Sequence, residues 1–79
     1  MTASILVVED EPAIQELISV TLTRNGHAVR RAATAADAYE AVTEALPDVI
    51  LLDWMLPDAA GPTLARRLRA EAQIGRAHV

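Results

Sequence analysis

Two short apolar runs that end in acidic residues place the strongest constraint on the fold of this chain. Residues 49–52 read Val-Ile-Leu-Leu and lead into Asp53, and residues 5–8 read Ile-Leu-Val-Val and lead into Glu9 and Asp10. A continuous apolar run without polar alternation is typical of a strand buried on both faces of a parallel sheet. Open α/β sheets place their ligand sites at the carboxyl ends of such strands. If the two runs lie side by side, the three acidic side chains meet at one edge of the sheet.

Each of these acidic residues also has an ordinary structural interpretation. An aspartate after a strand is often only a polar terminator, and acidic residues before a helix are common N-caps. Three carboxylates at one point would, however, repel one another and recruit a cation or raise a pKa. Oxygen ligands favour Mg²⁺ over zinc, and the chain has no cysteine. Of the three acids, Asp53 ends the central strand and is therefore the best-placed nucleophile for attack on a phosphoryl group.

The rest of the chain alternates helical and extended patterns. Pro12 suits a first helical position, Asn25-Gly26 is a stop signal, and Thr34 is a suitable N-cap. The expected elements after the first strand are a helix at 11–24, an edge strand at 27–32, a helix from the Thr34 cap to Leu46, the strand at 49–52 and a helix at 62–72.

Apolar side chains at helical spacing predict which face of each helix packs inward. The predicted inward residues are Ile14, Leu17, Ile18 and Leu22 in the first helix, Ala38, Tyr39, Val42, Ala45 and Leu46 in the second, and Leu64 and Leu68 in the third. The resulting β-α-β-α-β-α order indicates an α/β fold, with a parallel sheet, right-handed crossovers and helices on both faces.

Composition limits the classes of function. With 79 residues the chain forms one small domain, and its net charge of −4 argues against direct nucleic-acid binding. The N-terminus leads into a strand without a signal-peptide pattern or membrane span, so a cytoplasmic protein with no membrane contact is expected. The glycines form neither a P-loop nor a dinucleotide fingerprint. His27 and His78 have no partners at metal-ligand spacing and are interpreted as structural or exposed.

Two motifs carry a resemblance to a known family. Residues 5–12, Ile-Leu-Val-Val-Glu-Asp-Glu-Pro, and residues 51–58, Leu-Leu-Asp-Trp-Met-Leu-Pro-Asp, followed by Gly61, resemble the receiver domain of two-component response regulators. The motifs occur in the family's order and spacing, and the resemblance covers residues 4–73. Trp-Met-Leu-Pro after the aspartate is similar to receivers of the winged-helix transcription-factor class. The resemblance implies a flavodoxin-like parallel sheet and a role in phosphorelay signal transduction.

The resemblance also implies a role for each motif residue. Asp53 would be the phosphoacceptor and would take a phosphoryl group from the phosphohistidine of a sensor histidine kinase. Mg²⁺ would be held by Asp10 and Asp53, by Glu9 directly or through water, and by the backbone carbonyl of Met55. The first helix, near residues 14–18, would contribute to kinase docking.

The chain departs from the family pattern after the third predicted helix, where the family's remaining strands and helices cannot be recognised in the sequence. Only three of the family's five strands are readable, and the fourth strand with its Thr or Ser and the fifth with its Lys are not. The sequence contains no lysine, so weak Mg²⁺ binding and poor phosphotransfer are expected. The last two helices, which form the dimer face in winged-helix relatives, and a DNA-binding domain are also not readable. In the strand order 2-1-3-4-5, the strand at 49–52 then becomes an edge of the sheet.

These observations predict a division of the chain into a partial receiver domain at residues 1–73 and a non-native or disordered tail at residues 74–79. The tail reads Ile-Gly-Arg-Ala-His-Val and fits no helical stripe. Its codons can spell a common sequencing-adapter read, so the sequence is interpreted as a gene fragment of a DNA-binding transcriptional regulator.

Two alternatives belong to other functional classes. The chain could be an adaptor that binds a partner without phosphorylation, since the family's lysine and threonine are not readable. It could also be a Mg²⁺-dependent phosphohydrolase with a strand-end aspartate as nucleophile. That class usually has a second aspartate two residues after the nucleophile, where this chain has Met55. The predicted function is therefore that of a phosphoacceptor, not an enzyme.

Overall fold

The computed structural model describes residues 2–53 and 55–75, with side chains described up to residue 70. Strands and helices alternate along the chain, as the sequence predicts. The elements are β1 (Ser4–Val8), α1 (Pro12–Arg24), β2 (Ala28–Ala32), α2 (Ala35–Glu44), β3 (Val49–Leu52) and α3 (Gly61–Gly75).

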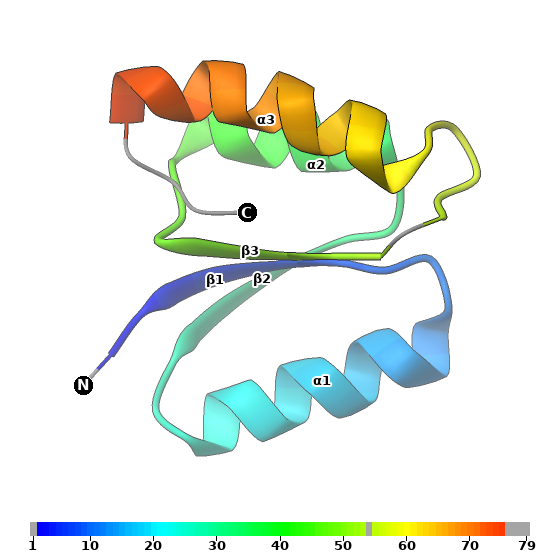
Figure 1. Ribbon diagram of the computed structural model, residues 1–79. Coiled ribbons are helices and arrows are strands. Elements are labelled where there is room, and N and C mark those ends of the chain that lie inside the picture. Colours follow the sequence, from blue (N-terminus) through cyan, green and yellow to red (C-terminus); the bar gives the residue numbers. More distant parts are fainter. Residues whose placement is uncertain (1, 54, 76–79) are drawn as a thin grey trace.

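The three strands form one parallel sheet in the order β2-β1-β3. Val8 at the end of β1 is paired with Ala32 of β2 and with Leu52 of β3, so all three strands end at the same edge. Helix α1 covers one face of the sheet, and α2 and α3 lie together over the other (Figure 1). The predicted α/β architecture and contiguous 2-1-3 strand order are confirmed.

Local sequence signals explain where the helices begin and end. Helix α1 starts with Pro12, and the Glu11 carboxylate caps it by accepting a hydrogen bond from the Ala13 N–H at 3.3 Å. It stops before Gly26, whose φ of 87° lies in the left-handed region that glycine adopts without strain. Helix α2 starts where the Thr34 hydroxyl accepts the Asp37 N–H at 3.1 Å.

The hydrophobic core lies between the sheet and the α2–α3 layer. Its members come from all three strands, from both helices of that layer and from the β3–α3 loop. They are Leu6, Val8, Ala32, Ala35, Ala38, Val42, Ile50, Leu56, Leu64 and Leu68. Burial of these side chains is the main force that fixes the sheet edge on which the acidic residues lie.

The predicted inward face of α1 is partly wrong. Ile14 and Leu17 are 47% and 68% exposed, whereas Ser19 is buried and Ile18 is half-buried. The face that meets the sheet is thus rotated toward Ser19, whose small side chain permits close packing. Among the described residues, a single helix lies on this side of the sheet, so no second layer covers the remaining apolar positions (Figure 1).

Three further predictions about element boundaries and burial need correction. Helix α2 ends at Glu44, which leaves Leu46 exposed because the chain is already extended at Ala45. Strand β3 is not buried on both faces: Ile50 is buried but Leu51 is 39% exposed, because α1 packs mainly on β1 and β2 and leaves this face of β3 uncovered. Helix α3 continues to Gly75, past the predicted end at Ala72 and into the segment predicted as a tail.

Residues 76–79 of the predicted tail lie outside the described residues. Among the helices that are described, none combines the length and the apolar character that crossing a membrane requires.

Candidate functional site

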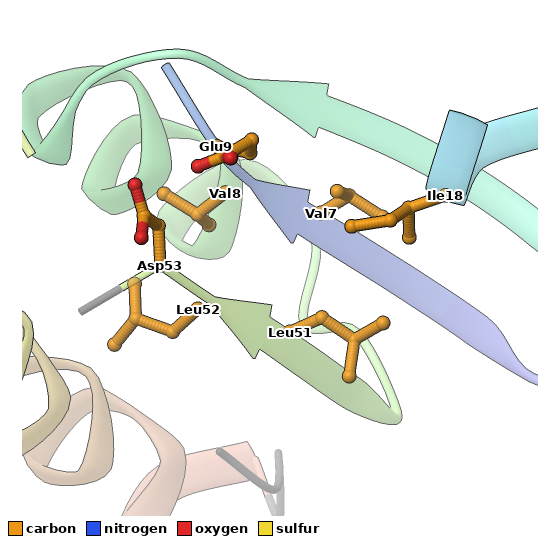
Figure 2. A pocket seen from close by; sticks show the side chains of 7 residues that line it. All are labelled: Val7, Val8, Glu9, Ile18, Leu51, Leu52 and Asp53. Carbon is orange, nitrogen blue, oxygen red and sulfur yellow. The ribbon is translucent and has the colours of Figure 1, made fainter. Parts of the chain in front are cut away.

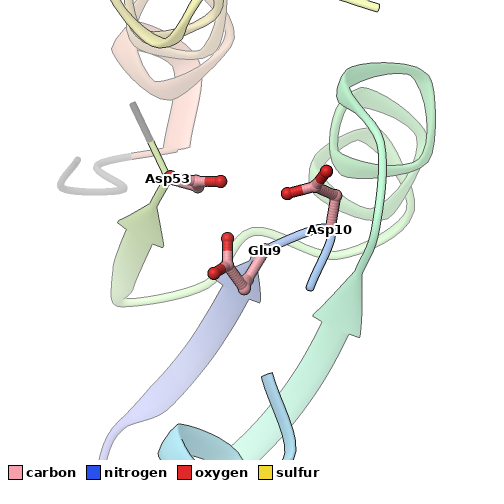
Figure 3. A group of neighbouring side chains, drawn as sticks. All are labelled: Glu9, Asp10 and Asp53. Atoms are coloured by element: carbon pink, nitrogen blue, oxygen red, sulfur yellow. The ribbon is translucent and has the colours of Figure 1, made fainter. Parts of the chain in front are cut away.

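Parallel pairing of β1 and β3 brings the acidic residues together. Because Val8 is paired with Leu52, the residues that follow them leave the sheet side by side. The Asp53 N–H continues this pairing by donating to the Val8 carbonyl at 2.9 Å. Figure 3 shows Glu9, Asp10 and Asp53 grouped at this edge, and one carboxylate oxygen from each lies within 4.8 Å of the others.

Burial and charge act together on Glu9, which is only 8% exposed, while Asp53 is half-buried and Asp10 is exposed. The pKa of Glu9 is raised from 4.5 to about 7. The largest cause is a side-chain hydrogen bond with Asp53, followed by burial and by the negative charges of Asp53 and Asp10. In the absence of a cation, Glu9 therefore titrates near neutral pH.

One buried oxygen of this group needs a partner. Oε2 of Glu9 is fully buried and has no hydrogen-bond partner among the described residues. An unsatisfied buried carboxylate oxygen is costly, and a cation is one group that would satisfy it. The three residues offer only carboxylate oxygens, which suits a hard divalent cation. The acidic cluster can therefore bind a metal.

The backbone of Glu9 is held by both neighbouring elements. Its N–H donates to the Ala32 carbonyl at the end of β2, at 3.0 Å. The Gln15 side chain of α1 donates to the Glu9 carbonyl at 2.9 Å and to the Ala32 carbonyl at 3.1 Å. Gln15 thus ties the first turns of α1 to the strand ends and fixes the direction in which Glu9 leaves the sheet.

A shallow cavity of about 190 Å³ leads to the acidic residues on the α1 side of the sheet. Figure 2 shows the carboxylates of Glu9 and Asp53 at one end, and Val7, Ile18 and Leu51 at the other. The polar end makes Asp53 accessible from solvent, whereas the other end is an apolar groove.

The β3–α3 loop lies beside Asp53. Met55 forms an isolated bridge with Ala60, and within the loop the Leu56 N–H donates to the Ala59 carbonyl at 3.2 Å. The Asp58 carboxylate accepts hydrogen bonds from the first backbone N–H groups of α2. These bonds lower the pKa of Asp58 below its usual value, with the Ala35 N–H as the largest cause.

Most of the predicted site residues are brought together, and the roles assigned to them remain predictions. Glu9, Asp10 and Asp53 form the cluster, while the Met55 side chain is 66% exposed and the expected role of its backbone carbonyl is untested. His27 is structural, since its Nδ1 accepts the Ala3 N–H at 3.1 Å. His78 lies outside the described residues.

Sequence reasoning assigned no role to two residues whose side chains link elements near the site, Gln15 and Asp58. Both bond to the backbone of segments that are distant in sequence. Asp58 belongs to the motif at residues 51–58 but was given no role of its own, and a polar side chain such as Gln15 does not identify its partner from the sequence.

Comparison with known proteins places these observations in a family. The sequence profile of the response regulator receiver domain matches residues 5–77. The chain is 43% identical over 68 residues to the phosphate regulon transcriptional regulatory protein PhoB of Pseudomonas aeruginosa, covering 86% of this chain and 30% of that protein. It is 41% identical over 71 residues to the transcriptional regulatory protein AfsQ1 of Streptomyces coelicolor, covering 90% of this chain and 32% of the relative. The chain thus spans about a third of the length of these curated relatives.

Solved structures agree with the fold. NtrX from Brucella abortus superposes with a TM-score of 0.88 at 32% identity, covering 92% of this chain and 17% of that one. A CheY-like response regulator receiver domain from Methylobacillus flagellatus superposes with a TM-score of 0.84 at 30% identity, covering 89% and 59% of the two chains. On its sequence, its strand order and the acidic residues at its sheet edge, the chain belongs to the response regulator receiver domain family of two-component signalling.

Proposed function

We propose that Asp53 is the phosphoacceptor of this receiver domain and that it acts with a Mg²⁺ ion. The ion would be held by Glu9, Asp10 and Asp53, with the backbone carbonyl of Met55 as a further ligand. The single observation that carries the proposal is the convergence of three carboxylates at the end of β1 and β3, with one buried oxygen of Glu9 lacking a partner.

The arrangement suits Asp53 as a nucleophile. Its half-buried carboxylate can be reached from the cavity, whereas Glu9 is more deeply buried. Asp53 also lies directly after β3, beside the cavity, so its carboxylate oxygen can approach an incoming phosphorus atom. When bound, Mg²⁺ would neutralise the charge of the carboxylates and of the phosphoryl oxygens.

Transfer consists of one exchange of bonds. An oxygen of Asp53 forms a bond to phosphorus while the phosphorus–nitrogen bond of a phosphohistidine breaks, and the electron pair of that bond stays on the imidazole nitrogen. The phosphohistidine is proposed to belong to a sensor histidine kinase that docks near α1, where Ile14 and Leu17 are exposed. The product is an acyl phosphate on Asp53, and the chain acts as a phosphoryl acceptor instead of a turnover enzyme.

The wider role follows from the relatives. Both PhoB and AfsQ1 are named transcriptional regulatory proteins. We infer a cytoplasmic parent protein whose phosphorylation controls transcription, with contact to DNA through a further domain.

Labelling with a small phosphodonor tests the proposal. The chain is incubated with acetyl phosphate and Mg²⁺, and intact mass spectrometry measures the addition of one phosphoryl group. We expect slow labelling, because the sequence contains no lysine to contact the phosphoryl group. Asp53→Asn should abolish it, and chelation of Mg²⁺ should reduce it at least about tenfold.

The matched control is Asp48→Asn at the opposite end of β3. Asp48 accepts the Ser4 N–H at 2.7 Å, a bond that an asparagine oxygen can still accept. This variant should be labelled like the wild type. Labelling that persists in Asp53→Asn, or a wild type that is not labelled with Mg²⁺ present, would contradict the assignment of Asp53. Saturable Mg²⁺ binding without any labelling would instead favour a phosphorylation-independent adaptor.

A further inference from the structure

The side chain of Asp58 joins the β3–α3 loop to the N-terminus of α2. Oδ1 of Asp58 accepts the Ala35 N–H at 2.7 Å, and Oδ2 accepts the Ala36 N–H at 3.0 Å. Asp58 and these partners are more than 20 residues apart in sequence. Both carboxylate oxygens are therefore used to hold the loop against another element.

Other contacts of the described residues also fix the loop. At its base, Met55 is bridged to Ala60, and in its middle the Leu56 side chain is buried in the core. Asp58 lies between Leu56 and Ala60, at the part of the loop farthest along the chain from both bridge residues. Among the described residues, this part of the loop is also held by the Leu56–Ala59 backbone bond and by packing of Ala59 against the core, but Asp58 makes its side-chain hydrogen bonds to α2.

We propose that Asp58 is a positioning residue for the acidic site: by clamping the β3–α3 loop onto α2, it keeps the backbone of Met55 beside Asp53. The inference rests on the proposed function, in which the Met55 carbonyl is a ligand of Mg²⁺. It adds a residue that touches neither the metal nor the phosphoryl group but sets the geometry of a residue that does.

The negative charge of Asp58 is stabilised by the N-terminus of α2. A carboxylate at a helix N-terminus is stabilised by the unpaired N–H groups and by the helix dipole. The lowered pKa of Asp58 agrees with this pairing. Asp58 is also not a member of the acidic cluster formed by Glu9, Asp10 and Asp53. Substitution of Asp58 should therefore change the position of the β3–α3 loop but leave the number of carboxylate ligands at the metal site unchanged.

The first turn of α2 has a second cap that is independent of the loop. The Thr34 hydroxyl accepts the Asp37 N–H at 3.1 Å, and Thr34 immediately precedes the helix. Thr34→Ala thus removes a cap from the same helix end without releasing the loop. This variant separates a positioning role of Asp58 from mere stabilisation of α2.

Mg²⁺ titration of the full chain tests the proposal. The single tryptophan, Trp54, follows Asp53 directly in the sequence, and its fluorescence is the signal recorded in the titration. We expect Asp58→Ala to weaken the apparent Mg²⁺ affinity about 3- to 10-fold. Thr34→Ala should lower the melting temperature but leave the Mg²⁺ affinity within about twofold of the wild type.

Each outcome decides the question. Unchanged affinity in Asp58→Ala, or an equal loss in Thr34→Ala, overturns the positioning role. If Asp58→Ala loses its circular dichroism signal, Asp58→Leu decides instead: leucine is close to aspartate in size but offers no acceptor oxygen to Ala35 and Ala36, and an affinity equal to the wild type overturns the proposal. A wild type without a saturable Mg²⁺ response overturns it together with the metal part of the proposed function. Failure of phosphoryl labelling alone leaves the Mg²⁺ result valid and affects only the assignment of Asp53.

Discussion

At the scale of single residues, Glu9 determines how the site responds to pH. Its carboxyl group is buried beside Asp53 and Asp10, and its pKa of about 7 means that ionisation of Glu9 costs free energy in the folded protein. A bound cation would remove that cost by pairing with the buried charge. The protonation state of this residue and the binding of a metal are therefore linked.

The first prediction concerns the pH dependence of stability. The pKa of Glu9 is raised on folding, so its contribution to the free energy of unfolding is complete below pH 4.5 and is lost as the pH rises through about 7. We expect urea unfolding without divalent cations to show that the free energy of unfolding of the wild type falls between pH 4.5 and about 7. Relative to Glu9→Gln, this fall should be on the order of 2 kcal/mol.

Mg²⁺ supplies the control for this measurement. Addition of the ion at pH 8 should stabilise the wild type more than Glu9→Gln, because the glutamine has no charge to pair with the ion. If the wild type and Glu9→Gln show parallel pH profiles, Glu9 does not have the raised pKa on which this account depends.

At the scale of elements, connections between strands and helices depend on a few side chains that bond to distant backbone. Arg30 of β2 donates to the Ala41 carbonyl of α2 at 2.9 Å and to the Ala45 carbonyl at its C-terminal cap. Asp58 holds the other end of α2. Helix α2 is thus fixed at both ends by charges of the sign that its dipole favours.

The second prediction tests this bond to the end of α2. Arg30→Ala should lower the free energy of unfolding by about 1–2 kcal/mol, because two carbonyls at the end of α2 lose a charged donor. The neighbouring Arg31 is the matched control. Its ion pair with Glu16 at 2.6 Å joins two exposed side chains, so Arg31→Ala should change the stability by less than about 1 kcal/mol. Equal effects of the two substitutions in thermal unfolding would contradict this interpretation of Arg30.

Element order and the acidic cluster could be predicted from the sequence because both follow from local patterns. Apolar runs give the strands, and parallel strands that end in acids must place those acids at one edge. The inward face of α1 could not be predicted this way: Leu17 is exposed and Ser19 is buried. Which face is buried depends on what covers the helix, and spacing alone cannot report this.

The hydrogen bonds from side chains to the backbone of other elements could also not be predicted from sequence patterns. Asp58, Gln15 and Arg30 each bond to backbone groups of another element, and every residue offers such groups. Periodicity identifies which side chains are apolar, but it carries no signal for a contact of this kind. The buried oxygen of Glu9 likewise became evident only when the strand ends were seen together.

At the scale of the whole molecule, strand β3 is both the support of the site and an edge of the described sheet. A cavity lies on each side of it, one of about 190 Å³ toward α1 and one of about 270 Å³ toward α3. Both are lined in part by Leu51, which is 39% exposed. An edge strand with exposed apolar side chains favours pairing with another chain.

The third prediction is that the chain self-associates through β3. Analytical ultracentrifugation should show an average mass that rises with concentration, and Leu51→Lys should shift the distribution toward the monomer. Leu46→Lys is the control, because Leu46 has the same exposed fraction but does not line either cavity. A wild type that stays monomeric, or an equal effect of both lysines, would show that β3 does not drive association.

The central claim is that Glu9, Asp10 and Asp53 form one cation-binding site at the ends of β1 and β3. The most direct test follows the backbone amide resonances by nuclear magnetic resonance during a titration with Mg²⁺. The account predicts saturable shifts, all with one dissociation constant, concentrated at these three residues and at Met55. Shifts scattered over other acidic residues, or different dissociation constants for Glu9 and Asp53, would contradict it.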